Sequence, residues 1–86
     1  MPEISRFFGI VVTMYPDDHP PPHFHARYGE HAAQVGIESM VVLQGRLPPR
    51  VLGLVLEWAV RHQAELRENW RRSQARERML PIRPLE

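Results

Sequence analysis

The sequence predicts an α+β fold in a single domain of residues 1–86: a small, mainly antiparallel sheet of three to four strands packed by one long C-terminal helix, with an extended tail. Residues 7–45 hold short runs of β-branched and aromatic residues separated by glycine and proline, which is typical of strands and turns. Residues 49–76 carry apolar side chains at helical spacing. A chain of 86 residues is long enough for one hydrophobic core but not for two.

The first and last expected strands are bounded by turn residues. Phe7–Tyr15 is rich in Phe, Ile, Val and Tyr and is stopped by Pro16-Asp17-Asp18. Both of its faces are mostly apolar, so we expect this strand to lie in the middle of the sheet. Met40–Leu43 is expected to form a short strand that ends at Gln44-Gly45.

A hairpin is expected between these two strands, formed by His23–Tyr28 and His31–Ile37 around the turn residues Gly29-Glu30. A two-residue turn fixes the register, and the expected pairs are Tyr28 with His31, Ala26 with Ala33, Phe24 with Val35, His25 with Gln34 and His23 with Gly36. Side chains alternate along a strand, so one set faces the core (Phe24, Ala26 and Tyr28) and the other faces outward (His23, His25 and Arg27).

A single helix is expected over residues 49–76, with a proline in its first turn, where proline is tolerated. Its apolar positions recur every three or four residues: Leu52, Val55, Leu56, Ala59, Leu66 and Trp70. Pro81 and Pro84 exclude a helix from residues 79–86, which we expect to form an edge strand or a docking tail.

Composition narrows the compartment and the chemistry. The chain has no cysteine, which excludes disulfides, thiolate metal ligands and a cysteine nucleophile. Residues 1–6 lack the charged-then-apolar layout of a signal peptide, and no apolar run approaches the ~20 residues that span a bilayer. We therefore expect a soluble cytoplasmic protein, and its small size leads us to expect a partner protein or a homo-oligomer.

Charge is unevenly distributed along the chain. Residues 1–45 contain two arginines and five acidic residues, whereas residues 46–86 contain nine arginines and five glutamates. Four arginines near the end of the expected helix form the candidate contact surface for a partner protein or nucleic acid: Arg71, Arg72, Arg76 and Arg78. The alternative is a solvated helix face on which arginines pair with glutamates four residues away.

Three of the five histidines lie within seven residues, in the segment His19-Pro20-Pro21-Pro22-His23-Phe24-His25. His23 and His25 are two residues apart, so on a strand both project from the same face, ~6–7 Å from each other. The three prolines keep the segment extended and hold His19 away from His23. This cluster is the main candidate site of the sequence.

Three interpretations of the cluster are open. As a metal site, His19, His23 and His25, or the last two with an aspartate, would bind a divalent ion such as zinc or manganese and leave a position for water or substrate. As a metal-free acid–base site on RNA, His23 and His25 would transfer protons while Arg27 holds a phosphate. As a structural cluster, the imidazoles would hydrogen-bond to backbone carbonyls at the sheet edge.

Motifs spread over nearly the whole chain carry a family resemblance. They are Pro2–Ile10, Asp18–His25, Tyr28-Gly29-Glu30, Gly45–Arg50, Leu56–Ala59, Glu65-Leu66 and Asn69-Trp70. Together they resemble a family of short bacterial proteins, the domain of unknown function DUF4160. The proline-spaced histidines are a specific motif, and Ile82–Leu85 is similar to the usual end of the family.

The resemblance implies a partner rather than a reaction. Members are often encoded beside another small protein, an arrangement similar to a toxin–antitoxin pair, and the family has no settled activity. It therefore favours a small RNase or translation inhibitor with a small partner protein encoded nearby, and it assigns no catalytic residue. Our leading expectation is a component of a two-gene toxin–antitoxin-like module that acts on RNA through the histidine cluster. The alternative is a non-catalytic protein- or metal-binding module.

Overall fold

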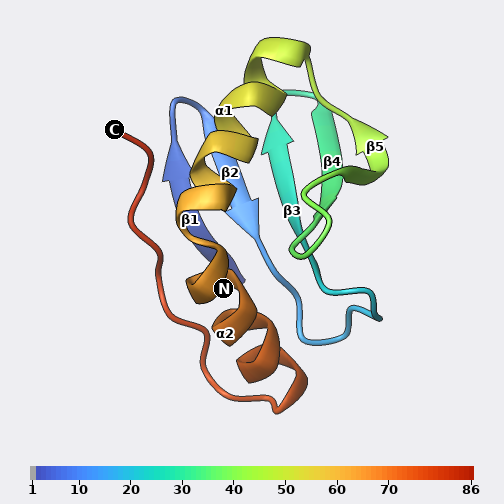
Figure 1. Cartoon of the computed structure of the whole chain (residues 1–86), viewed down its shortest axis with the longest axis vertical. Helices are drawn as coiled ribbons and strands as arrows, with labels where there is room; N and C mark the ends of the chain where they lie inside the picture. Colours follow the sequence, from blue (N-terminus) through green and yellow to red (C-terminus); the bar gives the residue numbers. More distant parts are fainter. Residues whose placement is uncertain (1) are drawn as a thin grey trace.

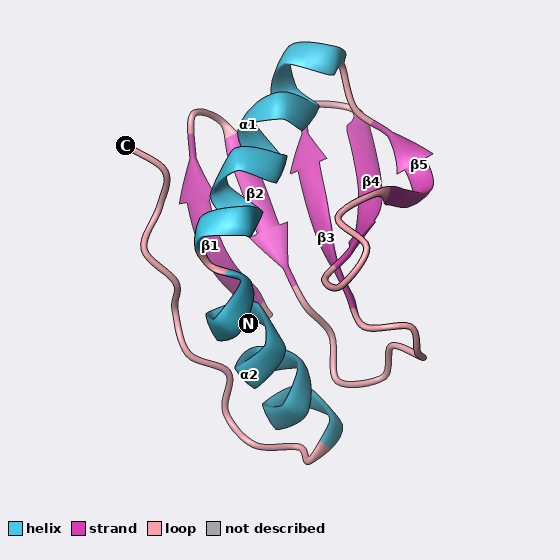
Figure 2. Ribbon diagram, viewed as in Figure 1, coloured by secondary structure: helices cyan, strands magenta, loops and turns pink. Residues whose placement is uncertain are grey.

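The computed structural model describes residues 2–86 and contains a five-stranded antiparallel sheet with two helices packed on one face (Figure 1). The elements are β1 (Glu3–Phe7), β2 (Ile10–Thr13), β3 (His23–Tyr28), β4 (His31–Gly36), β5 (Val42–Arg46), α1 (Pro49–Arg61) and α2 (Gln63–Gln74). Each strand pairs with its neighbours in sequence, in the order β1-β2-β3-β4-β5 (Figure 2). The α+β class is confirmed, whereas the prediction of three to four strands and one long helix is wrong in its details.

The expected first strand, Phe7–Tyr15, is broken near its start by the hairpin turn that joins β1 to β2. The chain turns at Phe8 and Gly9, whose φ angles are 51° and 79°, so Phe7 pairs with Ile10 across the turn. Glycine adopts positive φ readily, whereas phenylalanine rarely does. Because phenylalanine is common in strands, Phe8 gave no sign of the turn. The added strand β1 lies at the sheet edge, and β2 rather than the whole of Phe7–Tyr15 lies inside the sheet.

The second hairpin has the predicted register. All five expected pairs between β3 and β4 occur, including His25 with Gln34 and His23 with Gly36. The following strand begins later than predicted, because Met40 adopts a φ of 56° and its N–H donates to the Gly36 carbonyl at 2.9 Å. That turn delays pairing until Val42, so β5 replaces the expected strand Met40–Leu43.

The core lies between the inner face of the sheet and α1. Strand side chains alternate into it, and α1 adds one buried side chain per turn; the fully buried members include Ile10, Val12, Phe24, Val35, Val55 and Trp58. The Trp58 ring lies 5.4 Å from Phe7 and 5.7 Å from Phe24, measured between ring centroids. This tryptophan joins the helix to the strands on both sides of β2.

The expected continuous helix over 49–76 is interrupted at His62. This residue has φ −120° and ψ 25°, and its N–H is shared between the Trp58 and Ala59 carbonyls. The side-chain amide of Gln63 then donates to the Ile37 carbonyl at 2.8 Å. No glycine or proline marks the break, so helical periodicity alone carries no sign of it. Within residues 2–86, neither helix has the length and apolar character needed to cross a membrane.

The tail docks along the helices and the edge of the sheet. Ile82 and Leu85 are buried, and the Ile82 N–H donates to the Ile4 carbonyl at 2.7 Å. The Trp58 indole N–H donates to the Arg83 carbonyl at 2.9 Å. Residues 77–86 form no regular strand, so the docking tail is the alternative that the structure supports.

Candidate functional site

The site lies where β3 begins, at the end of the sheet that faces the β2–β3 loop and the last turns of α2 (Figure 1). His23 and His25 come from β3, and Asp18 comes from the loop. The Asp18 Oδ2 atom lies 2.8 Å from His25 Nε2 and 3.4 Å from His23 Nε2. One ligand atom from each of the three residues can be chosen so that all lie within 4.8 Å of one another. We call these three residues the histidine–aspartate cluster.

The backbone fixes the orientation of His23. Its Nδ1 lies 2.8 Å from the Pro21 carbonyl oxygen. A carbonyl only accepts hydrogen bonds, so Nδ1 must carry the proton in this contact. In the neutral imidazole the lone pair then sits on Nε2, the atom that faces Asp18. His23 therefore presents an acceptor or ligand atom toward the centre of the cluster.

One side of the cluster is covered and the other is open. His23 is only 6% exposed, and its ring packs 5.5 Å from the Trp70 ring on α2. The side chains of Asp18 and His25 keep 20% and 26% exposure. Tyr15 packs edge-on against the His25 ring at 4.9 Å. A small ligand can thus reach the cluster from the side of Asp18 and His25.

The loop that carries Asp18 is held at several points. The Ile37 N–H donates to the Pro22 carbonyl at 3.0 Å, which ties the proline segment to the end of β4. Gln74 on α2 donates from Nε2 to the Asp18 carbonyl at 3.2 Å. Arg76 donates to the Asp17 carboxylate at 3.0 Å. Together with the stiffness of three consecutive prolines, these bonds set where Asp18 lies.

The structure brings together only part of the residue set named from the sequence. His23 and His25 converge as their spacing indicates, and the third member is Asp18, the aspartate alternative, while His19 is exposed in the loop outside the cluster. Arg27 is exposed two residues beyond His25 on β3. The contributions of the Pro21 carbonyl and of Trp70 had no sequence signal, because both depend on the path of the loop and on helix packing.

The arginines of the expected contact surface are largely paired within the chain. Arg71 binds Glu68 at 2.8 Å and Glu77 at 3.2 Å, and Arg72 binds Glu68 at 2.9 Å. The hydrogen bond from Arg71 holds the pKa of the Glu68 carboxyl below its usual value, and the same bond raises the pKa of Arg71. Arg76 binds Asp17, and Arg78 is exposed.

Comparison with known families identifies the chain. A family model described as a domain of unknown function, DUF4160, matches residues 9–71, which include the whole histidine–aspartate cluster. The chain belongs to the DUF4160 family. No curated protein and no solved structure matches it.

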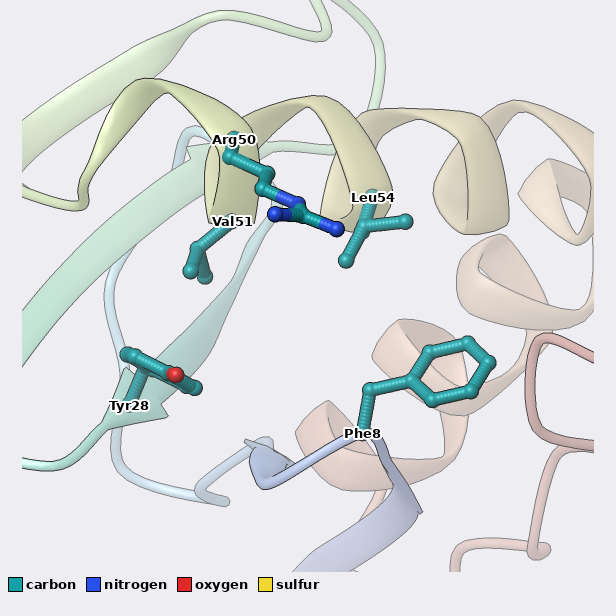
Figure 3. A pocket seen from close by; sticks show the side chains of 5 residues that line it. All are labelled: Phe8, Tyr28, Arg50, Val51 and Leu54. Atoms are coloured by element: carbon teal, nitrogen blue, oxygen red, sulfur yellow. The ribbon is translucent and has the colours of Figure 1, made fainter.

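A separate hollow of the DUF4160 domain lies at the other end of β3. It is lined by Phe8, Tyr28, Arg50, Val51 and Leu54, and Figure 3 shows these five side chains around it. Tyr28 ends β3 whereas His23 begins it, so the hollow lies ~17 Å from the cluster along the strand. Its lining is mostly apolar, with Arg50 as the charged member, and it offers no group of metal-ligating side chains.

The cluster gives the DUF4160 domain two kinds of chemistry. Two imidazole nitrogens and a carboxylate form a ligand set that zinc, manganese and iron accept, and three protein ligands leave further coordination positions open. The same three groups can also act without a metal, as a carboxylate-paired imidazole beside a second imidazole.

Proposed function

We propose that this DUF4160 domain binds a divalent metal ion through Asp18, His23 and His25, and that it hydrolyses RNA as one component of a two-gene toxin–antitoxin-like module. The observation that carries the proposal is the convergence of three ligand atoms from a loop and a strand on one partly open point. The family resemblance supports the module and the partner protein, and the cluster supports the chemistry.

The distances within the cluster support a metal site. Ligand atoms ~2.0–2.1 Å from one ion are ~3.3 Å apart in a tetrahedral site and ~2.9 Å apart in an octahedral one. The separations from Asp18 Oδ2 to the two imidazole nitrogens are 2.8 and 3.4 Å. Both separations are close to these ligand spacings, and all three potential ligand atoms lie within 4.8 Å of one another.

Each residue of the cluster has a separate task in this proposal. The Pro21 carbonyl keeps the Nδ1 proton of His23 in place and turns Nε2 toward the ion, as outer-shell carbonyls do for metal-bound histidines. Asp18 supplies the negative charge, and His25 supplies the ligand nearest to solvent. A bound divalent ion supplies Lewis-acid chemistry, which polarises a phosphoryl oxygen and lowers the pKa of water.

A metal-free acid–base site is the second candidate. It is favoured by the His25–Asp18 distance of 2.8 Å, which is that of a good hydrogen bond between an imidazole N–H and a carboxylate. His25 would then exchange a proton with the RNA while Asp18 orients its ring, and His23 would serve as the second imidazole. A non-catalytic binding module remains the alternative of a different class.

Metal analysis of protein purified without a histidine tag tests the proposal. We expect close to one divalent ion per chain in the wild type and in His31→Ala, an exposed histidine at the far end of β4. His23→Ala and His25→Ala should lose most of the metal, and circular dichroism checks that each variant is folded. Equal metal content in all four proteins, or none in the wild type, would overturn the metal site.

Expression from a tightly repressed promoter tests the action on RNA. We expect growth arrest and cleaved cellular RNA with the wild type and with His31→Ala, but not with His25→Ala. Purified protein treated with EDTA should lose RNA cleavage and regain it with added zinc or manganese. Cleavage that persists in EDTA favours the metal-free candidate, and the absence of both arrest and cleavage leaves the binding module.

A further inference from the structure

One face of the sheet is left free by both helices. Two neighbouring hollows lie on it, and all of the side chains that line them belong to residues 2–45. The first includes Thr13 and Arg27, the second includes Gln34, and His25 lines both. The exposed side of the histidine–aspartate cluster therefore opens onto this free face of the sheet.

The register of the sheet places arginines in a row across this face. Arg6 pairs with Val11, Val11 with Arg27, Arg27 with Ala32 and Ala32 with Arg46. Directly opposed residues share a face, so β1, β3 and β5 each present an arginine in one row, ~10 Å apart. The residues between them, Val11 and Ala32, are small and uncharged. We call these five residues the arginine row.

The middle and one end of the arginine row carry free charge. Arg6 is held by two bonds from its guanidinium to Glu3, the shorter at 2.8 Å. The ion pairs recorded for residues 2–86 include neither Arg27 nor Arg46. These two exposed guanidinium groups contrast with Arg71 and Arg72, whose charges are matched by glutamates.

A second row of residues runs beside the arginine row and contains His25 of the cluster. The paired residues are Glu3, Thr13, His25, Gln34 and Gln44, in order across the five strands. The two rows are separated by ~7 Å, the distance between alternate residues of a strand. Thr13, Gln34 and Gln44 both donate and accept hydrogen bonds, as does a ribose 2′-hydroxyl. Tyr15, 41% exposed, lies against His25 and presents an aromatic ring for base stacking.

We propose that this free face of the sheet binds a single strand of RNA, whose phosphates lie along the arginine row and whose backbone passes His25. The inference rests on the proposed function and names the surface through which the substrate reaches the cluster. A sheet face with cations, one aromatic ring and neutral hydrogen-bonding groups fits a single strand, because side chains can reach its unpaired bases. The row of groups that match the 2′-hydroxyl favours RNA over DNA.

Fluorescence anisotropy with a labelled 12-nucleotide single-stranded RNA, in EDTA to prevent cleavage, tests the surface. We expect Arg27→Ala and Arg46→Ala each to weaken binding several-fold and to reduce the slope of log affinity against log salt by ~0.7. Ala32→Glu, which adds a negative charge at an exposed position in the middle of the row, should abolish binding. Arg50→Ala removes the same charge from the opposite, helical side (Figure 3) and should change affinity less than twofold.

The outcomes separate this surface from the metal site. His23→Ala should lose metal yet keep its RNA affinity, so failure of the proposed metal centre does not imitate failure of the surface. Equal weakening by Arg27→Ala and Arg50→Ala would overturn the inference, as would wild-type binding in Ala32→Glu. Equal affinity for DNA of the same sequence would overturn the choice of RNA, and no binding in low salt would reject the surface altogether.

Discussion

The histidine–aspartate cluster and the arginine-rich end of α2 lie beside each other but use their charged groups in opposite ways. On α2, Arg71 and Arg72 bind Glu68, and Arg76, two residues beyond the end of the helix, binds Asp17. In the cluster, two imidazoles turn their nitrogens toward a single carboxylate oxygen. At the helix end the charged side chains bind partners within the chain. In the cluster the polar side chains converge at a point that solvent can reach.

This difference shows that the charge of a sequence segment does not reveal whether its arginines have partners within the chain. Polar side chains on α2 and just after it also hold other parts of the chain: Gln74 and Arg76 bind the loop that carries Asp18, and Asn69 binds the tail. Arg27 and Arg46, which lie outside the ion pairs of residues 2–86, are instead on the sheet, where the strand register places both in one row. In our proposal, α2 is the support, and the cluster with its adjoining sheet face is the functional surface.

The largest expected effect comes from removing a support contact on α2. Asn69 is 1% exposed, and its amide both donates to the Leu80 carbonyl and accepts from the Leu80 N–H, each at 2.8 Å. Asn69→Ala leaves both backbone groups of Leu80 without this partner, so we expect a loss of ~2–4 kcal/mol in the free energy of unfolding, measured in urea. Gln63→Ala removes a single bond to the Ile37 carbonyl and should cost only ~1 kcal/mol.

The metal content of Asn69→Ala tests whether α2 acts only as a support. If α2 is a support, the protein that remains folded should bind as much metal per chain as the wild type. A variant that unfolds within ~0.5 kcal/mol of the wild type would contradict the role given to Asn69, since surface substitutions typically fall in that range.

The next effect separates two adjacent aspartates. Asp18 lies in the cluster, whereas the Asp17 side chain is 84% exposed and binds Arg76. Loss of a residue that only orients a metal ligand typically weakens metal binding ~10–100-fold. Asp18 is a proposed ligand itself, so Asp18→Asn should weaken zinc binding by at least this much. Asp17→Asn makes the same chemical change one residue earlier and should stay within about threefold of the wild type. Isothermal titration calorimetry with zinc alone measures the affinity of both variants. An equal loss of affinity in the two would show that Asp18 is not a metal ligand.

The sequence predicted the parts of the fold that depend on neighbouring residues. The β3–β4 register followed from a two-residue turn and from the alternation of side chains, and it placed His23 and His25 together. The β1–β2 hairpin escaped because Phe8 adopts a positive φ in a segment with the composition of one strand. The break at His62 escaped because no residue type there disfavours a helix.

The third member of the cluster could not be chosen from the sequence. Periodicity gives the direction of side chains on a strand but not the path of a loop. The sequence therefore favours His19 as the third member and leaves an aspartate only as the alternative. The place of Asp18 depends on its backbone bond to Gln74, which is 56 residues away along the chain. The arginine row is a similar case, because it appears only when all five strands are set in register.

A smaller effect on RNA affinity is expected from removing an arginine of α2 that is already paired within the chain. Arg71→Ala should change the affinity for the single-stranded RNA less than twofold, because its guanidinium is held by Glu68 and Glu77. Arg27→Ala, which removes the same charge from the sheet, is the matched comparison in the same anisotropy titration. If Arg71→Ala lowered the RNA affinity as much as Arg27→Ala does, the RNA-binding surface would include the end of α2, contrary to our proposal.

The smallest effect concerns the ion pair between Arg67 on α2 and Glu38 beyond β4, joined by two bonds of 2.8 Å. The hydrogen bond from Arg67 lowers the pKa of the Glu38 carboxyl. A lowered pKa in the folded state adds stability above the unfolded value of ~4.3, and this contribution disappears as the pH falls through the folded pKa. Both side chains are exposed, so the contribution is slight and weakens with salt.

Thermal unfolding measured from pH 6 to pH 3 therefore tests whether the ion pair between Arg67 and Glu38 stabilises the folded chain. Glu38→Gln should melt slightly below the wild type at pH 6, and the two melting temperatures should converge toward pH 3 because protonation of Glu38 removes the same charge. Glu30→Gln is the control, since Glu30 lies exposed in the β3–β4 turn, outside the ion pairs recorded for residues 2–86. A Glu38→Gln deficit that stays constant across this range would mean that the Glu38 charge adds nothing, and that Arg67 is as free to meet an external anion as Arg27.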